Sequence, residues 1–204
     1  MATERAVDLG AGALRPHRPD TRAAMAAAAA ELVGPGRTVA LGASDQAAVV
    51  ARCLLAVPGL TVVTNSLPAA GLLREAARER RAAPAVFLTG GTPTPSGALV
   101  GVLAEETIRS LHVDLVILGA HGVTASEGVT AVGPAEARTD RAFIASARRT
   151  AVVADRTAWG VLGPADVAAA QEIDCFVTDD ALPAAARAAL ESAVGELVVV
   201  RVAR

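Results

Sequence analysis

The chain has 204 residues, of which 52% are hydrophobic and 20% charged, so it can bury a substantial core and lacks the composition of a disordered protein. A formal net charge of −2 argues against a chain that holds nucleic acid by itself, because phosphate binding requires a concentrated basic face. All 19 basic residues are arginine, which excludes Schiff-base chemistry and a lysine clamp on phosphate.

The two cysteines, Cys53 and Cys175, lie in apolar runs and are too few for a disulfide framework or a metal cluster. We therefore expect buried free thiols in a reducing compartment, and neither a metal nor another cofactor. The N-terminus lacks the apolar core of a secretory signal, and no apolar run is long enough to cross a bilayer. These features predict a cytoplasmic protein without membrane contact.

Hydrophobic periodicity and turn residues predict the secondary structure. Residues 1–19 contain glycines and prolines without a clear period and are expected to form a linker or arm before one domain over residues 20–204. The expected helices cover residues 20–33, 44–56 (capped by Ser44 or Asp45), 68–81, 99–111, 134–149 and 183–194. The expected strands lie between them, at residues 38–41, 60–64, 85–88, 113–118, 151–154, 173–178 and 197–202. Residues 92–97 are expected to form a loop and residues 156–171 an irregular segment.

Strand and helix alternate almost throughout this series. The alternation predicts an α/β fold: a three-layer, open, mostly parallel sheet with helices on both faces. Ligands of such sheets bind beyond the carboxyl ends of the strands. Glycines and small polar residues follow most of the predicted strands, so the segments 42–45, 65–66, 90–91 and 119–122, together with Asp155, are expected to meet at one edge.

The run from Val113 to Thr130 is the main candidate for the floor of a binding site. Its apolar first half is typical of a strand buried on both faces, and it breaks abruptly into Gly119-Ala-His-Gly122. Glycines there let the backbone turn or approach a ligand closely. A tight turn without a ligand explains the same spacing, and a lone histidine such as His121 often makes only a structural hydrogen bond.

Several motifs, taken together in their order and spacing, resemble the sensor domain of the DeoR family. They are Thr61-Val-Val-Thr-Asn-Ser66, Leu88-Thr-Gly-Gly91, Leu118-Gly-Ala-His-Gly-Val123 followed by Glu127-Gly-Val-Thr130, Glu136-Ala137, Val153-Ala-Asp155 and Val177-Thr-Asp-Asp180. This domain is the C-terminal, effector-binding half of bacterial repressors of sugar metabolism. The resemblance covers roughly residues 20–202.

The resemblance implies a fold similar to ribose-5-phosphate isomerase and the CoA transferases, a pocket for a small polar metabolite such as a sugar phosphate, and a role in transcription regulation. It implies a homo-oligomer, with residues 99–111 and the apolar C-terminus as candidate surfaces, and contact with DNA only through an N-terminal winged helix-turn-helix that this sequence does not contain. The expected ligand-binding residues are Gly42, Ser44, Asp45, Asn65, Ser66, Gly90, Gly91, Gly119, His121, Gly122, Glu136, Asp140, Asp155 and Arg156. Of these, Ser44, Asn65, Gly91, Gly122, Glu136 and Asp155 are expected to line one pocket.

The charge of the expected pocket departs from the family pattern. Asp140 and Ala158 stand where the family usually has lysines, and Asp45 adds a negative charge to the loop that usually binds phosphate. Arg138 and Arg156 lie nearby in sequence, where they either compensate for the lost lysines or stay solvated on the surface. A phosphomonoester needs compensating positive charge, so the sequence favours a neutral or cationic ligand, such as a free sugar, a polyol or an amine-bearing metabolite.

Two alternatives to a non-catalytic sensor stay open on the sequence alone. An isomerase or CoA-transferase-like enzyme would use His121 as a general base or Glu136 as a nucleophile. An oligomerisation module with a decayed pocket would also explain the missing lysines.

Overall fold

The computed structural model describes residues 19–79 and 83–201, so the predicted linker or arm lies almost entirely outside the described residues. The centre of the described fold is a parallel sheet of seven strands in the order β12-β11-β9-β6-β1-β2-β3. The strands are β1 (Thr38–Leu41), β2 (Thr61–Thr64), β3 (Ala85–Leu88), β6 (Leu115–Gly119), β9 (Thr150–Val153), β11 (Cys175–Asp179) and β12 (Glu196–Val200). This architecture confirms the predicted α/β class and the open, mostly parallel sheet.

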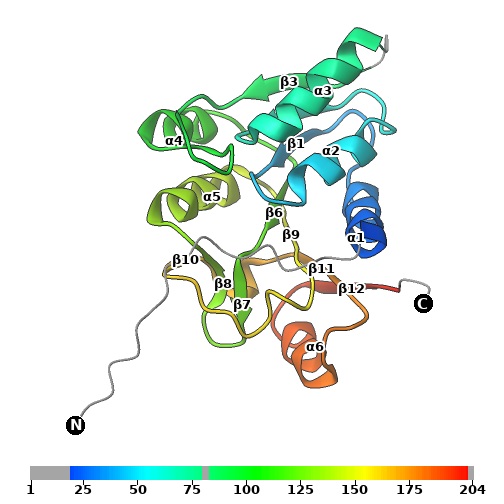
Figure 1. The fold of residues 1–204 in the computed structure, drawn as a ribbon, viewed down its shortest axis with the longest axis vertical. Helices are drawn as coiled ribbons and strands as arrows, with labels where there is room; N and C mark the ends of the chain where they lie inside the picture. The colour runs from blue at the N-terminus through cyan, green and yellow to red at the C-terminus, as the bar shows by residue number, and fades with distance from the viewer. Residues whose placement is uncertain (1–18, 80–82, 202–204) are drawn as a thin grey trace.

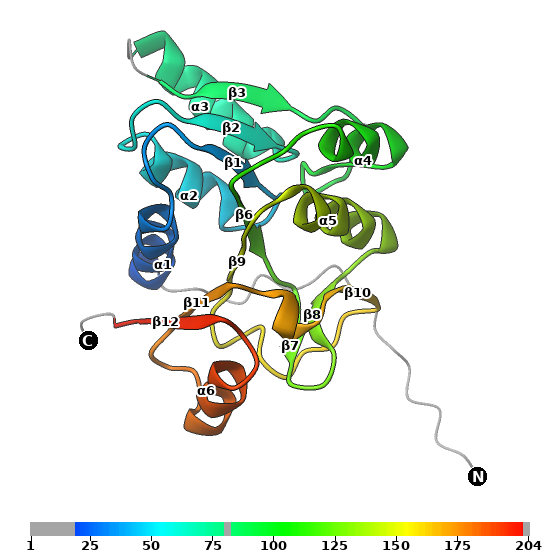
Figure 2. The same ribbon diagram turned by 180° about the vertical axis from the view of Figure 1, so that it is seen from behind.

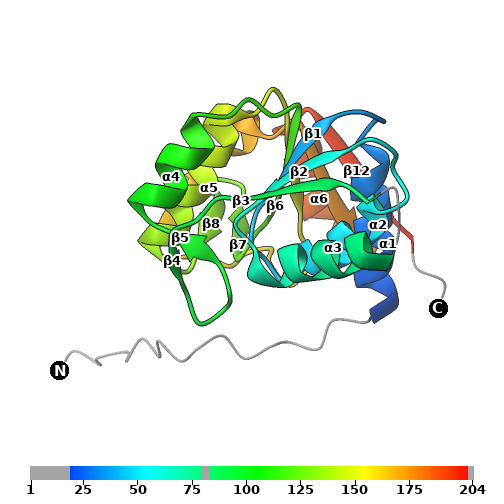
Figure 3. The same cartoon turned by 90° about the horizontal axis from the view of Figure 1, so that it is seen from above.

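Helices cover both faces of the sheet, three on each side (Figures 1, 2 and 3). One face carries α1 (Pro19–Glu31), α2 (Ala47–Leu54) and α3 (Leu67–Glu79), and the other carries α4 (Val102–Arg109), α5 (Pro134–Ser146) and α6 (Ala184–Glu191). Right-handed crossovers between parallel strands place helices in this way.

The middle strand β6 shows how the sequence builds two cores. Side chains alternate along a strand, and here Val116 and Leu118 pack into the core under α4, α5 and α6. Leu115 and Ile117 point the other way, into the core under α1, α2 and α3. Each of these four side chains is at most 5% exposed, as expected for a strand covered on both faces.

Two small antiparallel sheets were not predicted from the sequence. A three-stranded sheet in the order β10-β8-β7 follows β6, and a two-stranded hairpin precedes α4. Their strands are β4 (Thr92–Pro93), β5 (Leu99–Val100), β7 (Gly122–Thr124), β8 (Gly128–Ala131) and β10 (Ala165–Ala168), and a 3-10 turn, η1 (Ala170–Glu172), follows β10.

The predictions of a plain loop over 92–97, a helix from residue 99 and a wholly irregular segment over 156–171 are therefore wrong in part. Thr92 and Pro93 pair with Val100 and Leu99, and Gly101 at a φ of 96° is outside helical geometry, so α4 begins three residues later than expected. Likewise β10 pairs with β8 inside the segment predicted to be irregular. The predicted helix caps at Ser44 and Asp45 are also wrong, because α2 begins after Gln46 without a side-chain cap.

The strand order reverses direction between β1 and β6, which are neighbours in the sheet but far apart in sequence. Crossovers from β1 run toward β3 and those from β6 run toward β12. The crevice beyond the carboxyl ends of two such strands is the usual ligand site of an open α/β sheet.

Candidate functional site

A cavity of about 550 Å³ lies at this point, beyond the ends of β1, β6 and β9. Its walls come from the loop 43–46, the turn 119–121, the strand β8 and the first turns of α5. The volume falls within the range of small-molecule sites, roughly 300–1,000 Å³.

The loop after β1 is fixed by buried hydrogen bonds. The side-chain oxygen of Asn65 accepts the Ala43 N–H at 2.7 Å, and the Asn65 amide donates to the Leu99 carbonyl at 3.1 Å. Gly42 donates to the Ile117 carbonyl at 3.0 Å, which joins the loop to β6. The loop therefore reaches the pocket with its backbone already held.

Gly119 explains how the two strand ends come so close. A Cβ atom at this position would lie 2.5 Å from the Cβ of Ser44, closer than two carbon atoms can approach. A glycine at the end of β6 thus leaves room for Ser44 on the rim of the pocket.

The predicted ligand-binding residues divide into two equal groups. Seven line the pocket: Ser44, Asp45, Gly119, His121, Glu136, Asp140 and Asp155. Seven lie outside its lining: Gly42, Asn65, Ser66, Gly90, Gly91, Gly122 and Arg156. Of the six residues expected to share one pocket, Ser44, Glu136 and Asp155 line the cavity, whereas Asn65, Gly91 and Gly122 do not.

The residues outside the lining have structural contacts instead. Asn65 holds the loop, and the Ser66 hydroxyl accepts the Ala69 N–H in the first turn of α3. Gly91 has a φ of 112°, and a Cβ there would lie 2.7 Å from the Val100 carbonyl oxygen. Gly122 packs still more tightly, because a Cβ would lie 2.2 Å from the Val161 carbonyl oxygen.

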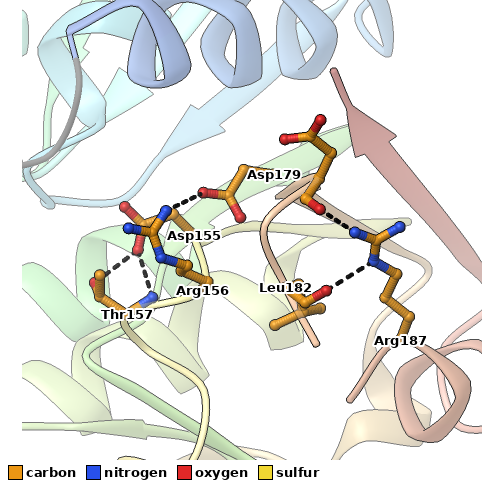
Figure 4. Close-up of polar contacts among 7 residues, drawn as sticks. Asp155, Arg156, Thr157, Asp179, Leu182 and Arg187 are labelled. Atoms are coloured by element: carbon orange, nitrogen blue, oxygen red, sulfur yellow. Dashed lines mark hydrogen bonds and ion pairs between the residues drawn. The ribbon is translucent and has the colours of Figure 1, made fainter. Parts of the chain in front are cut away.

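Arg156 points towards Asp179 at the end of β11, as Figure 4 shows. Its guanidinium lies 3.7 Å from the carboxylate of Asp179, which is 3% exposed. Burial and the nearby Asp155 carboxylate raise the pKa of Asp179, and Arg156 opposes that rise. Asp155 itself accepts the backbone N–H and the hydroxyl of Thr157.

A second arginine next to this cluster is also engaged. The Arg187 guanidinium donates to the carbonyls of Leu182 and Asp180, which tie the turn after β11 to α6 (Figure 4). Both arginines of this region thus serve contacts around the end of β11.

Carboxyl groups dominate the charge of the pocket. Glu136 and Asp140 lie one helical turn apart on α5, and Asp140 lies close to the loop after β1. Burial, and to a smaller extent the neighbouring Glu136 carboxylate, raise the pKa of Asp140 to about 8. Asp140 is therefore largely protonated near neutral pH in the free protein.

Two of the pocket residues that were not among the predicted ones, Arg22 and Gln46, have side-chain atoms without a hydrogen-bond partner. Arg22 of α1 lines the pocket and lies 3.7 Å from the Asp45 carboxylate, beyond hydrogen-bond distance. Gln46 is 8% exposed, also lines the pocket, and its side-chain oxygen has no hydrogen-bond partner; the Arg22 Nε has none either. Nothing in the sequence around these residues indicates that α1 and the start of α2 meet at the strand ends.

Metal binding and membrane insertion find no support in the parts of the chain that the structure describes. Within residues 19–79 and 83–201, no three His, Cys, Asp or Glu side chains are grouped so that they could hold a metal ion. In the same ranges, none of the helices combines the length and apolar character needed to cross a bilayer. Cys53 and Cys175 are both free.

Comparison with the sequences of known proteins shows the family of the chain. Residues 17–180 match the family described as the DeoR C-terminal sensor domain. The HTH-type transcriptional regulator GolR of Listeria innocua is 32% identical over 162 residues, which are 79% of this chain and 62% of that protein. The HTH-type transcriptional regulator GlpR of Haloferax volcanii is 35% identical over 182 residues, 89% of this chain and 69% of that protein.

The chain thus spans about two thirds of the length of these curated relatives. Among solved structures, ribose 5-phosphate isomerase A of Methanocaldococcus jannaschii is similar over 69% of this chain and 54% of that chain, with 16% identity and a TM-score of 0.49. The match to the sensor domain and the identity to both regulators lead to one conclusion: the chain belongs to the DeoR family and contains its C-terminal sensor domain.

Proposed function

We propose that this sensor domain binds a small polar metabolite in the pocket between the ends of β1 and β6, as the effector-sensing part of a bacterial regulator of sugar or carbon metabolism. The observation that carries the proposal is the pocket itself. It lies at the switch point of the sheet, and it is lined by the buried Gln46, whose side-chain oxygen has no partner. A buried polar atom without a hydrogen bond is costly, and a ligand can supply the missing bond.

Calorimetric titration and thermal shift with a panel of sugars, polyols and their derivatives test the proposal. A true effector raises the melting temperature by an amount that grows with the logarithm of its concentration over Kd. Gln46→Leu keeps the size of the side chain but removes the amide, and should weaken binding roughly 10-fold. Glu75→Gln, on the exposed side of α3, should leave affinity unchanged.

The pocket also bears on the alternative of a decayed module. A collapsed site would be filled by side chains, whereas a cavity of about 550 Å³ is large enough for a monosaccharide-sized ligand.

The enzyme alternative loses support because the relatives are named as transcriptional regulators, not as isomerases or transferases.

The assembly and partners of the whole protein form a second part of the proposal. We infer that the protein is a cytoplasmic homo-oligomer and that DNA recognition belongs to a helix-turn-helix domain outside these 204 residues. The names of both relatives, HTH-type transcriptional regulators of which this chain covers about two thirds, support the second inference. A gel shift with the 204-residue chain alone should show no salt-resistant, sequence-specific retardation of operator DNA.

A further inference from the structure

The charged groups around the pocket do not suit an anionic ligand. Four carboxyl side chains line it, from Asp45, Glu136, Asp140 and Asp155. Among the described lining residues they face a single arginine, Arg22, together with the exposed His121. Even with Asp140 left out of the count, three carboxyl side chains of the lining stand against one arginine.

The arginines that could have balanced this charge are held elsewhere. Arg138 of α5 lies 3.5 Å from the carboxylate of Glu105 on α4, and Arg156 lies 3.7 Å from Asp179. Neither lines the pocket. Both would have to leave a buried carboxylate partner to reach a phosphate, because Glu105 is 6% exposed and Asp179 is 3% exposed.

The excess of acidic over basic side chains is also seen at positions 140 and 158 of the pocket wall. Asp140 and Ala158 both line the cavity, so neither position adds a positive charge to the surface that a ligand would touch. No hydrogen bond or ion pair to the Asp140 side chain is found among the described residues, although the side chain is partly buried in the pocket wall. A cation in the cavity would give this carboxyl group the partner it lacks.

The two unsatisfied polar atoms on the wall add a second requirement. The Gln46 side-chain oxygen needs a donor, and the Arg22 Nε–H needs an acceptor. A hydroxyl group both donates and accepts, so one kind of group can serve both residues.

We infer that the effector is a polyhydroxylated amine, such as an amino sugar or amino polyol, that sets its protonated nitrogen against Glu136 and Asp140 and carries no phosphate ester. The inference rests on the proposed sensor function and narrows the class of its ligand. The hydroxyl groups of such a molecule satisfy Gln46 and Arg22, and its ammonium group offsets the carboxyl groups of α5.

Matched triplets of probes test the charge directly. Glucosamine is compared with glucose and glucose 6-phosphate, and the aminated, free and phosphorylated forms of ribose, galactose and glucitol are compared in the same way by calorimetry at pH 7.5. We expect the amine to bind tightest and the phosphate weakest within every triplet that binds, with on the order of 10-fold or more between amine and free sugar. A phosphate ester that binds tighter than its amine would overturn the charge inference while leaving the sensor function intact.

A panel in which no member of any triplet binds would count against the sensor function of this pocket, and the amine inference would fall with it. The two failures are therefore distinguishable.

Proton release gives a readout that does not depend on affinity. An ammonium group beside Asp140 favours its ionised form, so binding of the aminated glucitol, whose amine is already protonated at pH 7.5, should release the Asp140 proton to the buffer, measured by calorimetry in buffers of different ionisation enthalpy. The other titratable groups facing the pocket are Glu136 on the same helix, Asp45 after β1, His121 after β6 and Asp155 after β9.

Variants test whether the proton released on amine binding comes from the Asp140 carboxyl group. Asp140→Asn should abolish the release and weaken amine binding about 10-fold while leaving the free sugar nearly unchanged. Glu75→Gln, an exposed acidic residue on α3, is the matched control and should change neither quantity. Equal loss of amine and free-sugar binding in Asp140→Asn would mean a structural role for Asp140 and would overturn the inference.

Discussion

At the scale of single residues, Asp140 is the side chain whose ionisation the fold opposes most clearly. Burial and the Glu136 carboxylate raise its pKa in the folded state to about 8, far above that of an unfolded aspartate. The folded protein then binds more protons than the unfolded chain between about pH 4 and pH 8, so the stability contributed by this group falls as pH rises through that window.

Asp140→Asn should therefore stabilise the protein more at pH 8.5 than at pH 5. The difference should be about 2 kcal/mol, less than the full pKa shift implies, because water entering the pocket screens part of the burial penalty. Urea unfolding at both pH values measures it, with Glu75→Gln as a variant that should show no pH-dependent gain. An Asp140→Asn effect of equal size at both pH values would contradict the raised pKa.

Asn65 illustrates a residue that the sequence singled out for the wrong reason. It was expected to contact ligand because it follows a strand, but it is 2% exposed and bonds the backbone of Ala43 and Leu99. Sequence reasoning could place Asn65 at the correct edge of the sheet. It could not tell a side chain that faces the cavity from one that holds the loop beside it, because that depends on the hairpin before α4.

Asn65→Ala should cost about 2–4 kcal/mol of unfolding free energy, since it removes the partner of the partly buried Ala43 N–H and of the buried Leu99 carbonyl. It should also weaken ligand binding indirectly, through the loop 43–46. Chemical denaturation measures the first effect, and Ser110→Ala, which removes one exposed hydrogen bond on α4, should change stability by no more than about 0.5 kcal/mol. A loss in Asn65→Ala as small as that of Ser110→Ala would show that the loop holds without Asn65.

At the scale of elements, the strands of the main parallel sheet were predictable and those of the two small antiparallel sheets were not. β1 and β3 have the predicted bounds, and α3 begins within one residue of its expected start. The hairpin of β7 and β8 escaped prediction because its strands have three and four residues and contain glycine, which usually indicates a loop. Tertiary pairing with β10, rather than local propensity, makes them strands.

Two glycines in different elements give opposite predictions for the same substitution. Gly122 begins β7, and a Cβ there would meet the Val161 carbonyl oxygen at 2.2 Å, so Gly122→Ala must displace backbone and should cost about 2 kcal/mol or more. Gly71 lies exposed in α3 with nothing near its Cβ position, so Gly71→Ala should gain about 0.5–1 kcal/mol from helix propensity. Thermal and urea unfolding of the two variants measure the change in unfolding free energy and therefore its sign in each case. A neutral Gly122→Ala would mean that the β7–β8 hairpin shifts freely.

At the scale of the whole molecule, the topology places the candidate pocket at one edge of the sheet and leaves apolar surface at one end. The switch point between β1 and β6 was predictable as a general location, because every strand that was expected is present and parallel. The contribution of α1 through Arg22 was not predictable, since it depends on how the first helix packs against the sheet.

The apolar surface lies where β3 ends and α4 begins. Phe87 and Leu88 are 56% and 44% exposed on the edge strand, and Val102 and Leu103 are 67% and 69% exposed on the first turn of α4. The two segments lie close together, since a Cβ at Gly91 would be 3.0 Å from the Cβ of Ala104. Large exposed apolar side chains on these two neighbouring segments make this end of the molecule a candidate protein interface.

If the protein is a homo-oligomer that associates through this surface, Leu103→Glu should lower the molar mass measured by light scattering at micromolar concentration, because it places a charge in an interface that burial of apolar area stabilises. Leu162→Glu is the matched control: Leu162 is 61% exposed and lies in a different part of the chain, before β10. Both variants should keep the thermal unfolding of the native fold, since neither side chain is buried. A monomeric native protein would contradict the oligomer, and an equal loss of mass in Leu162→Glu would move the interface away from β3 and α4.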